Sequence, residues 1–431
     1  MKDEIFYIKG LGGKKTLKGE VSICGAKNAV LPLFASSLLF DDEVKFNNIP
    51  DIEDCLRMSE ILEKLGVSVI REKKGQYILN ASKTNGKVID EEIAKKLRAS
   101  IILTGPVLAR FGKVSFPHPG GCVIGARPID IFIDGYKSMG ATVKEKGGLY
   151  IIETKNGLKG ANIFLRNPSV TATEAFVMAA ILADGETVIK NAATEPEIMD
   201  LIEFLVSCGA KIKGEGTSTI TIVGSKKLLK ARGFSWRVVP DRIEAGSFLI
   251  LGALCADNLL ISNCEPKHLE ALTSELIASG VPITIGQDFL QIKNNAKISN
   301  KKFKSFNIKT HEYPGFPTDL QAPAIVFLTQ VLGESNVFET IFENRLGFAE
   351  DLVTMGANIR MLDAHRIIVK GPSVLKGREL YGPDLRAGLA FVIAGIVGKG
   401  ESRIHNVYYI DRGYEEIDKK LRSIGVDIKR I

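Results

Sequence analysis

The segment Asp54–Val69, DCLRMSEILEKLGVSV, carries the pattern that decides the fold. Its apolar residues recur at helical spacing as far as Gly66, and β-branched residues follow directly after the glycine. Glycine accepts the left-handed conformation that ends a helix, because it has no Cβ to clash. The segment therefore predicts an amphipathic helix that stops at Gly66 and turns back into a strand.

This helix–glycine–strand unit recurs along the whole chain. The corresponding glycines lie about 70 residues apart, a spacing too regular for chance, and they are Gly66, Gly140, Gly209, Gly280, Gly356 and Gly425. A chain of 431 residues is too long for one hydrophobic core, so the units predict two domains of three, with a midpoint near Arg232–Pro240. Periodicity alone leaves one alternative open, a solenoid of six repeats that serves as a binding scaffold.

Between these units lie stretches that are apolar nearly all round. Helices of this kind are buried on every side instead of lying on a surface. We therefore expect an α/β fold in which apolar helices fill the interior, while sheets and amphipathic helices lie outside. The expected inner helices cover residues Asn28–Phe40, Thr173–Ala183, Ala245–Ala256 and Ala387–Val397.

The composition is that of a globular protein, with 45% hydrophobic and 25% charged residues. The net charge of +7 comes from dispersed Lys and Arg, whereas a nucleic-acid footprint is normally a clustered basic stripe. No apolar run reaches the length of about 18 residues that a membrane span requires. The first residues lack the basic and apolar regions of a secretory signal. We expect a cytoplasmic protein without a nucleic-acid or membrane partner.

The six cysteines form no CxxC pair and show no spacing typical of a zinc site or a disulfide framework. Most are expected to be small buried side chains with free thiols. The chain also lacks a Walker A motif, a strand-linked GxGxxG, an HExxH and a GxSxG motif. Metal, nicotinamide and serine-hydrolase chemistry are therefore unsupported, and we expect no metal and no cofactor.

One cysteine lies in an unusual segment, Phe116–Pro128, which contains three prolines and three glycines around Cys122 and Arg127. Such a segment forms neither a helix nor a central strand, and it predicts an exposed loop. A neighbouring cation lowers the pKa of a thiol and favours the thiolate. From the local sequence alone, a reactive Cys122 and an incidental loop cysteine are equally good interpretations.

Several cations lie in turns at the junctions of different units, a pattern that favours a common anion-binding cleft. Lys27 directly precedes an apolar helix, whose N-terminal N–H groups can bind the same anion. Asp319 lies at the start of another apolar helix, where the local sequence favours capping or a helix-dipole role over a general base. Taken singly, each cation is more typical of a solvated surface, and the candidates are Lys27, Arg98, Arg345, Arg386 and Arg412.

Taken together, the motifs resemble those of the enolpyruvyl transferase family, and in particular of its UDP-N-acetylglucosamine 1-carboxyvinyltransferases of bacterial peptidoglycan synthesis. The resemblance covers essentially the whole chain. The motifs are GAKNAVLP (25–32), LRAS (97–100), PGGCVIGARPID (119–130), EPEI (195–198), VVPDRIEAG (238–246), FPTDLQA (316–322), FENR (342–345), DLRAG (384–388) and DRGYE (411–415).

The resemblance implies a two-domain inside-out α/β barrel, with three repeated α/β units in each domain, helices buried inside and sheets outside. In this family the first strand belongs with the C-terminal domain. The implied domains are therefore residues 1–20 plus 237–431, and residues 21–236, which carry the Cys122 loop. The substrates bind between the two domains, and the loop closes over them.

The resemblance also implies the reaction and its residues. The enolpyruvyl group of phosphoenolpyruvate moves to the 3-hydroxyl of UDP-N-acetylglucosamine, with phosphate release, as the first committed step of peptidoglycan synthesis. Cys122 matches the catalytic acid and Asp319 the base for the sugar hydroxyl. Lys27, Arg127 and Arg412 match residues that bind phosphoenolpyruvate, Lys27 and Arg412 being catalytic as well. The other matched substrate contacts are Asn28, Arg98, Pro128, Ile129, Asp130, Ile131, Ser169, Val170, Thr171, Ile341, Arg345 and Arg386.

Two alternatives stand beside this function. One is enolpyruvyl transfer to shikimate 3-phosphate by related family members, which lack a catalytic cysteine in a PGGC loop, so Cys122 counts against it. The other is a non-catalytic repeat scaffold, which predicts loss of the charged cleft residues. That set is complete in this chain: Lys27, Cys122, Arg127, Asp319 and Arg412.

Overall fold

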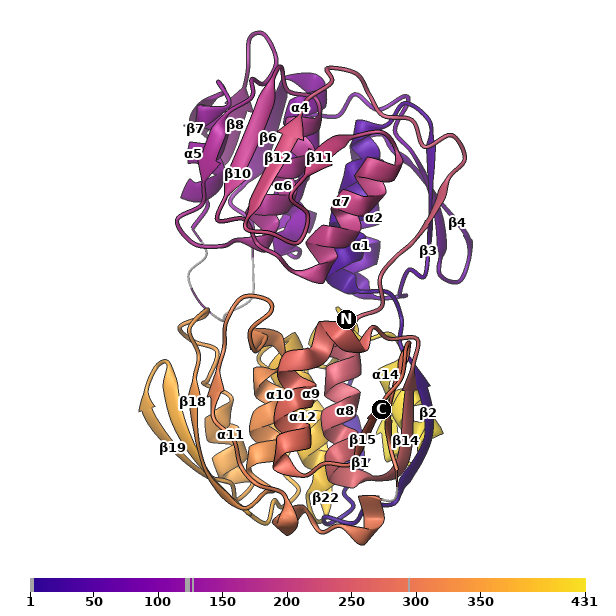
Figure 1. Cartoon of the computed structure of the whole chain (residues 1–431), viewed down its shortest axis with the longest axis vertical. Helices are drawn as coiled ribbons and strands as arrows, with labels where there is room; N and C mark the ends of the chain where they lie inside the picture. The colour runs from indigo at the N-terminus through magenta and orange to yellow at the C-terminus, as the bar shows by residue number, and fades with distance from the viewer. Residues whose placement is uncertain (1–3, 121–124, 126–127, 294) are drawn as a thin grey trace. The chain divides into compact units, whose positions relative to one another are not determined.

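The computed structural model describes residues 4–120, 125, 128–293 and 295–431, so the predictions for Cys122 and Arg127 lie outside the described residues. The chain divides into two compact units, each visible in Figure 1. We call residues 4–24 and 240–431 the terminal unit, and residues 25–120 and 128–239 the central unit. We propose that these units are the two expected domains, with boundaries at Cys24–Gly25 and Val239–Pro240 instead of after residues 20 and 236.

The described part of the terminal unit contains three four-stranded sheets with one common strand pattern. In each sheet one edge strand is parallel to its neighbour, and the other pairs are antiparallel. The strand orders are β21 (Glu379–Tyr381), β22 (Glu401–His405), β1 (Phe6–Lys9), β23 (Asp427–Arg430); β15 (Ile283–Ile285), β16 (Phe289–Ile292), β14 (Ala256–Ser262), β2 (Leu17–Ser22); and β17 (Ile308–Lys309), β18 (Gly333–Phe338), β20 (Arg366–Gly371), β19 (Asn358–Asp363).

The described part of the central unit contains two sheets of the same pattern and a three-stranded sheet. In the three-stranded sheet, a single parallel bridge between Val88 and Ser115 lies where the other sheets have their parallel edge strand. Each of the six predicted repeats therefore contributes to one sheet. The strand orders are β13 (Ser235–Arg237), β3 (Glu43–Asn47), β5 (Gln76–Asn80), β4 (Ser68–Lys73); β11 (Lys211–Lys213), β12 (Thr219–Val223), β10 (Glu186–Lys190), β9 (Asn162–Phe164); and β6 (Lys113–Pro117), β8 (Leu149–Glu153), β7 (Thr142–Lys146).

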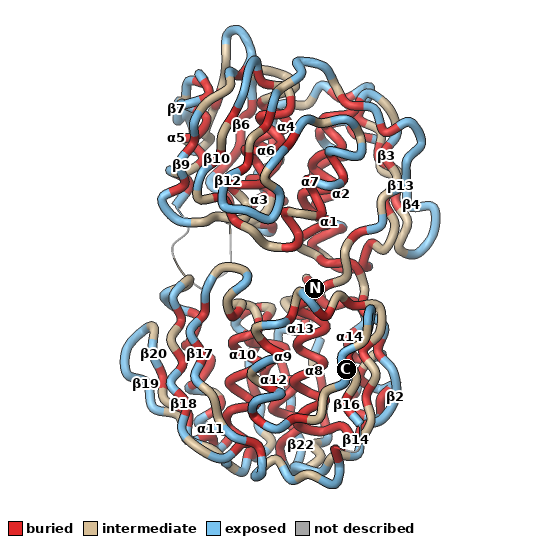
Figure 2. Tube along the Cα trace, viewed as in Figure 1, coloured by how far each residue is buried: buried red, intermediate tan, exposed pale blue. Residues whose placement is uncertain are grey.

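Apolar helices form the core of each unit, as Figure 2 shows by their burial. In the terminal unit α10 packs against α8 and α12, and in the central unit α4 packs against α6. The expected inner helices are confirmed, and α4 and α10 are inner helices as well. These buried helices are α8 (Arg242–Cys255), α10 (Thr318–Leu328), α12 (Leu385–Val397), α1 (Lys27–Ser36), α4 (Thr104–Phe111) and α6 (Val170–Ile181).

A second set of helices precedes the six repeated glycines. All six glycines have positive φ angles, from +87° at Gly140 to +108° at Gly356, which confirms that each closes its helix in a conformation that disfavours a Cβ. The predicted fold class, α/β with helices inside and sheets outside, is confirmed. These helices are α2 (Glu53–Lys64), α5 (Asp130–Ser138), α7 (Pro196–Ser207), α9 (Glu270–Ser279), α11 (Ala349–Thr354) and α14 (Ile417–Ser423).

The lengths of the helices bear on membrane association. Throughout the described residues, every helix is too short or too polar to cross a bilayer.

The shorter helices that complete the fold are α3 (Glu91–Ala94) and α13 (Val407–Asp411), together with the 3₁₀ turns η1 (Ser37–Leu39), η2 (Arg98–Leu103), η3 (Pro266–Leu269), η4 (Asn295–Lys297) and η5 (Asn300–Lys302).

A buried carboxyl group makes the stability of the central unit sensitive to pH. Asp200 on α7 is buried and accepts a hydrogen bond from Nε1 of Trp236 at 3.0 Å, and a longer one from the Val239 amide at 3.5 Å. Burial raises the pKa of Asp200 to about 7, although these two donors oppose the shift. The folded protein therefore holds a proton that the unfolded chain releases at a pH near 4.

We predict that Asp200→Asn removes a pH dependence of unfolding. A raised folded pKa means that folding stability falls as the pH rises from about 4 to about 7, by up to about 4 kcal/mol, and then levels off. Urea unfolding of wild type and Asp200→Asn, followed by circular dichroism across this range, measures the difference. The exposed Asp184, substituted in the same way, is the control. A difference between wild type and Asp200→Asn that stays constant with pH would contradict the prediction.

Candidate active site

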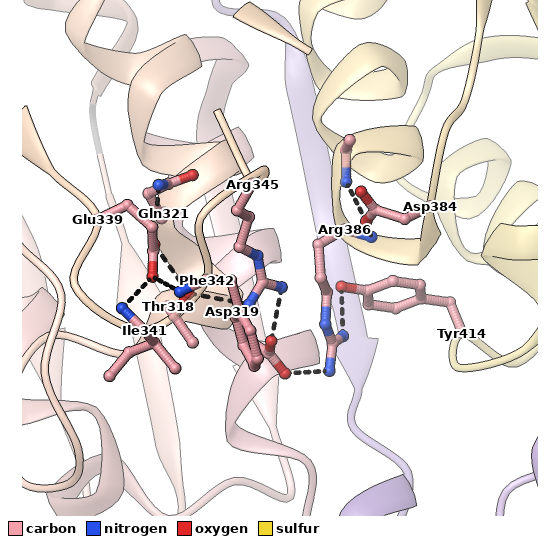
Figure 3. Close-up of polar contacts among 11 residues, drawn as sticks. Thr318, Asp319, Gln321, Glu339, Ile341, Phe342, Arg345, Asp384, Arg386 and Tyr414 are labelled. Carbon is pink, nitrogen blue, oxygen red and sulfur yellow. Dashed lines mark hydrogen bonds and ion pairs between the residues drawn. The ribbon is translucent and has the colours of Figure 1, made fainter. Parts of the chain in front are cut away.

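Asp319 lies in the first turn of α10, and its two carboxylate oxygens bind two different arginines (Figure 3). Nη2 of Arg345 donates to Oδ1 at 2.7 Å, and Nη2 of Arg386 donates to Oδ2 at 2.8 Å. The arginine side chains are 4% and 5% exposed, whereas that of Asp319 is 26% exposed. One carboxylate thus holds two nearly buried positive charges and keeps an accessible face.

The starts of two inner helices bring these groups together. Arg386 lies in the first turn of α12, which Asp384 caps by accepting the amides of Arg386 and Ala387 at 2.7 and 3.1 Å. Because α12 packs against α10, its first turn presents the Arg386 guanidinium to Asp319. The cap therefore fixes the position of the arginine as well as the helix end.

The cluster keeps Asp319 ionised. Burial alone would raise the pKa of its carboxyl group, but Arg386 and then Arg345 outweigh burial and hold this pKa well below its usual range. Burial would likewise lower the pKa of Arg386, yet the Asp319 carboxylate raises it above the ordinary value. At neutral pH these three side chains form a carboxylate between two guanidinium groups, with one positive charge in excess.

Tyr414 extends the cluster to a further motif. Its hydroxyl accepts a hydrogen bond from Nη1 of Arg386 at 2.8 Å, and burial raises the pKa of this phenol. Tyr414 belongs to the DRGYE segment, which also carries Arg412, the half-buried C-cap residue of α13. Arg386 is thus tied to the segment in which the resemblance places a phosphoenolpyruvate contact.

The structure decides between the two local interpretations of Asp319. Its capping role is wrong, because α10 has no side-chain cap and both Asp319 oxygens bind arginines. Asp319 does lie in the first turn of α10, where a carboxylate interacts favourably with the helix dipole. Glu343 and Asp384 stand beside Arg345 and Arg386 in the chain, but both guanidinium groups bind Asp319, which is distant in sequence.

In the central unit, Lys27 is the first residue of α1 and its ammonium binds Asp54 on α2 at 2.6 Å. The lysine side chain is 14% exposed and that of Asp54 only 2%. α1 packs against α2, so the pair joins the starts of two neighbouring helices. Asn28 follows within the same first turn and is half-buried. A buried carboxylate therefore fixes the direction in which Lys27 extends.

The remaining expected contacts of the central unit occupy three other helix starts. Arg98 begins η2, and its Nη1 donates to the carbonyl of Pro119 at 3.1 Å, so it is tied to the beginning of the Cys122 segment. Ser169 caps α6 through a 3.3 Å bond from the Ala172 amide. Pro128, Ile129, Asp130 and Ile131 form the entry to α5, and Val170 and Thr171 begin α6.

Ile341 is expected to contact the nucleotide sugar through its backbone. Its amide already donates to Oε1 of Glu339 at 2.9 Å. A ligand contact through this backbone would therefore use the Ile341 carbonyl oxygen. Figure 3 shows Ile341 beside Glu339 and Thr318.

Sequence reasoning missed several residues that support these groups. The repeated pattern marks Asp54 only as the start of a helix, and the motifs contain Thr318, Gln321 and Tyr414 without indicating their contacts. Glu339 lies outside the motifs. Asp54 has a partial signal, because an acid in the first turn of a helix is visible in the sequence, but its pairing with Lys27 follows only from the packing of α1 against α2.

Comparison with known proteins shows the class to which the chain belongs. A family model described as EPSP synthase (3-phosphoshikimate 1-carboxyvinyltransferase) matches residues 11–421. The structure also superposes on the enolpyruvyl transferase NikO from Streptomyces tendae with a TM-score of 0.87, at 20% identity and 99% coverage of both chains, a likeness of fold. The chain therefore belongs to the EPSP synthase family of carboxyvinyltransferases.

Relatives with higher sequence identity show the group within the family to which the chain belongs. The chain is 44% identical over 427 residues to a protein of Halothermothrix orenii, covering 99% of both, and 43% identical over 422 residues to one of Koribacter versatilis, covering 97% of this chain and 95% of the relative. Both relatives carry the name UDP-N-acetylglucosamine 1-carboxyvinyltransferase. Within the family, the chain is therefore a member of this group.

Proposed function

We propose that the protein transfers the enolpyruvyl group of phosphoenolpyruvate to the 3-hydroxyl of UDP-N-acetylglucosamine and releases phosphate by addition and elimination. The observation that carries the proposal is the Asp319–Arg345–Arg386 cluster in a chain more than 40% identical to proteins of that name. We place the reaction in the cytoplasm, as the first committed step of peptidoglycan synthesis.

The charges of the substrates explain the need for so many cations. Phosphoenolpyruvate carries up to three negative charges and the diphosphate of the nucleotide sugar about two, so their approach requires compensating charge. Lys27 and Arg412, with Arg127 from the sequence motif, bind the phosphate and carboxylate of phosphoenolpyruvate in this proposal. Arg98 and the starts of α5 and α6 bind the nucleotide, since helix N-termini attract anions.

Asp319 acts on the hydroxyl of the acceptor sugar. Its low pKa makes it a weak base in the free protein, because two guanidinium groups stabilise the carboxylate. It can nevertheless accept a hydrogen bond from the 3-hydroxyl and orient the oxygen toward C2 of phosphoenolpyruvate. Protonation of C3 makes C2 cationic, and the hydroxyl becomes acidic as it bonds to that carbon. A weak base then suffices to accept the proton.

Cys122 supplies the proton to C3 in this mechanism. This assignment rests on the PGGC motif and on the neighbouring Arg127 in the sequence, not on the geometry of the described residues. Addition of the sugar oxygen to C2 gives a tetrahedral intermediate. Phosphate then leaves from C2 while C3 returns a proton to the Cys122 thiolate, and the double bond re-forms. No redox step or group transfer to a cofactor is needed for this balance.

The alternative acceptor is shikimate 3-phosphate, the acceptor named in the description of the family model. The two acceptors can be separated in one assay. Purified protein with phosphoenolpyruvate is expected to release phosphate when UDP-N-acetylglucosamine is added, and at least about a hundredfold more slowly with shikimate 3-phosphate, because the latter lacks the nucleotide whose contacts hold the sugar. Equal rates with both acceptors, or none with the nucleotide sugar, would refute the proposed function.

A further inference from the structure

Glu339 is a fully buried acid that Thr318 separates from the Asp319 cluster, and its carboxylate accepts four hydrogen bonds (Figure 3). Oε1 accepts the amides of Ile341 and Phe342 at 2.9 and 3.1 Å. Oε2 accepts the hydroxyl of Thr318 and the side-chain amide of Gln321, each at 2.9 Å. One side chain thus connects the loop after β18 with the first turn of α10.

The Thr318 hydroxyl links this carboxylate to the cluster. It donates to Glu339 and accepts a hydrogen bond from Nη1 of Arg345 at 2.9 Å. Because the hydroxyl hydrogen of Thr318 is donated to Glu339, the lone pairs of the hydroxyl oxygen are left to accept from the guanidinium of Arg345. Arg345 is thereby held by Thr318 through Nη1 and by Asp319 through Nη2. The ion pair is thus linked to the Glu339 carboxylate through the Thr318 hydroxyl.

The backbone of Glu339 is anchored as firmly as its side chain. The Glu339 amide donates to the carbonyl of His365 at 2.8 Å, and Nδ1 of His365 lies 2.9 Å from the carbonyl oxygen of Glu339. His365 directly precedes β20, the neighbour of β18 in the sheet. The carboxylate is therefore a fixed point from which the Ile341–Arg345 loop is positioned.

We propose that Glu339 is a positioning residue for the nucleotide-sugar half of the reaction, a role that rests on the proposed function. It acts through Thr318 on Arg345 and Asp319, and through two backbone amides on the loop that carries Ile341. The residues assigned to phosphoenolpyruvate, Lys27 and Arg412, make no hydrogen bond with this carboxylate among its four contacts. The two substrates should therefore respond differently when Glu339 is changed.

The decisive variant is Glu339→Gln, which keeps the shape but replaces one acceptor oxygen with a donor. Either the loop amides or the Thr318 and Gln321 donors then meet an N–H group. We expect the KM for UDP-N-acetylglucosamine to rise about tenfold, as for the loss of one buried hydrogen bond, and the KM for phosphoenolpyruvate to stay within about twofold. A merely structural role would lower the amount of active protein and leave both KM values unchanged, and that result would overturn the proposal.

A matched pair of Thr318 variants tests the link through the hydroxyl. Thr318→Val removes the hydroxyl at constant size and is expected to raise the same KM, whereas Thr318→Ser should retain a KM at least about fivefold lower than that of Thr318→Val. Glu334→Gln removes an exposed acid from the same strand, β18, and serves as the charge control. Equal KM values for Thr318→Val and Thr318→Ser would refute the relay.

Hydrogen exchange separates this proposal from the proposed function. The amides of Ile341 and Phe342 should exchange at least about tenfold faster in Glu339→Gln than in wild type, while exchange in the inner helix α12 is unchanged. If wild type releases no phosphate with the nucleotide sugar, the proposed function fails and the exchange rates alone decide whether Glu339 orders the loop. Unchanged exchange at these two amides would overturn the positioning role even in an active enzyme.

Discussion

Asp319→Asn is expected to reduce phosphate release with both substrates about a thousandfold. The substitution keeps the shape of the side chain but removes the negative charge to which the acceptor hydroxyl donates. It also leaves Arg345 and Arg386, whose side chains are 4% and 5% exposed, without a counter-charge between them. Steady-state turnover at saturating concentrations of both substrates measures the effect.

The same variant should be less stable than wild type by about 3 kcal/mol, because it breaks a largely buried ion pair on one side only. The folded pKa of Asp319 is depressed, so its contribution to stability is present above the unfolded value near 4 and is lost as the pH falls below it. Asp288→Asn, an exposed change in the same unit, is the control for urea unfolding and turnover. Wild-type turnover in Asp319→Asn would exclude a role for this carboxylate in the reaction.

Cys122→Ser is expected to abolish turnover, with a loss of at least about a thousandfold, because a serine hydroxyl is a far weaker acid than a thiol. The fold should be retained, since the change replaces one atom in a segment rich in glycine and proline. Cys208→Ser, which alters a half-buried thiol of the central unit, is the matched control and should keep its activity. Turnover in Cys122→Ser at more than about a tenth of the wild-type rate would require another acid for C3.

The fold could be predicted because its signals are local and repeated. A glycine after each amphipathic helix marks a positive φ angle, and six such glycines at one spacing reveal six units. Four apolar segments were recognisable as inner helices, because they have no polar face. Asp319 marks the start of a further apolar helix, α10, whereas α4 was harder to recognise, because a proline, Pro106, obscures its helical pattern.

The candidate site could be predicted only in part. Motifs identified Asp319, Arg345 and Arg386 singly, but not that one carboxylate binds both arginines, because partners distant in sequence leave no local pattern. The contacts of Asp54 and Glu339 could not be predicted for the same reason. Their partners, Lys27 and Thr318, lie on other helices, and only the packing of these helices shows the pairing.

The position of β1 has a consequence for the order in which the chain can fold as it is synthesised. β1 lies between β22 and β23, and Ile5 exchanges backbone hydrogen bonds with Ile431. Residues 25–239 can collapse while the ribosome is still translating the rest, since their sheets use only their own strands. β1 gains its first neighbour, β22, only when residues 401–405 emerge, and its second, β23, only with residues 427–430. A truncation that removes β23 therefore leaves the first strand without one of its two neighbours, while the central unit retains all of its sheets.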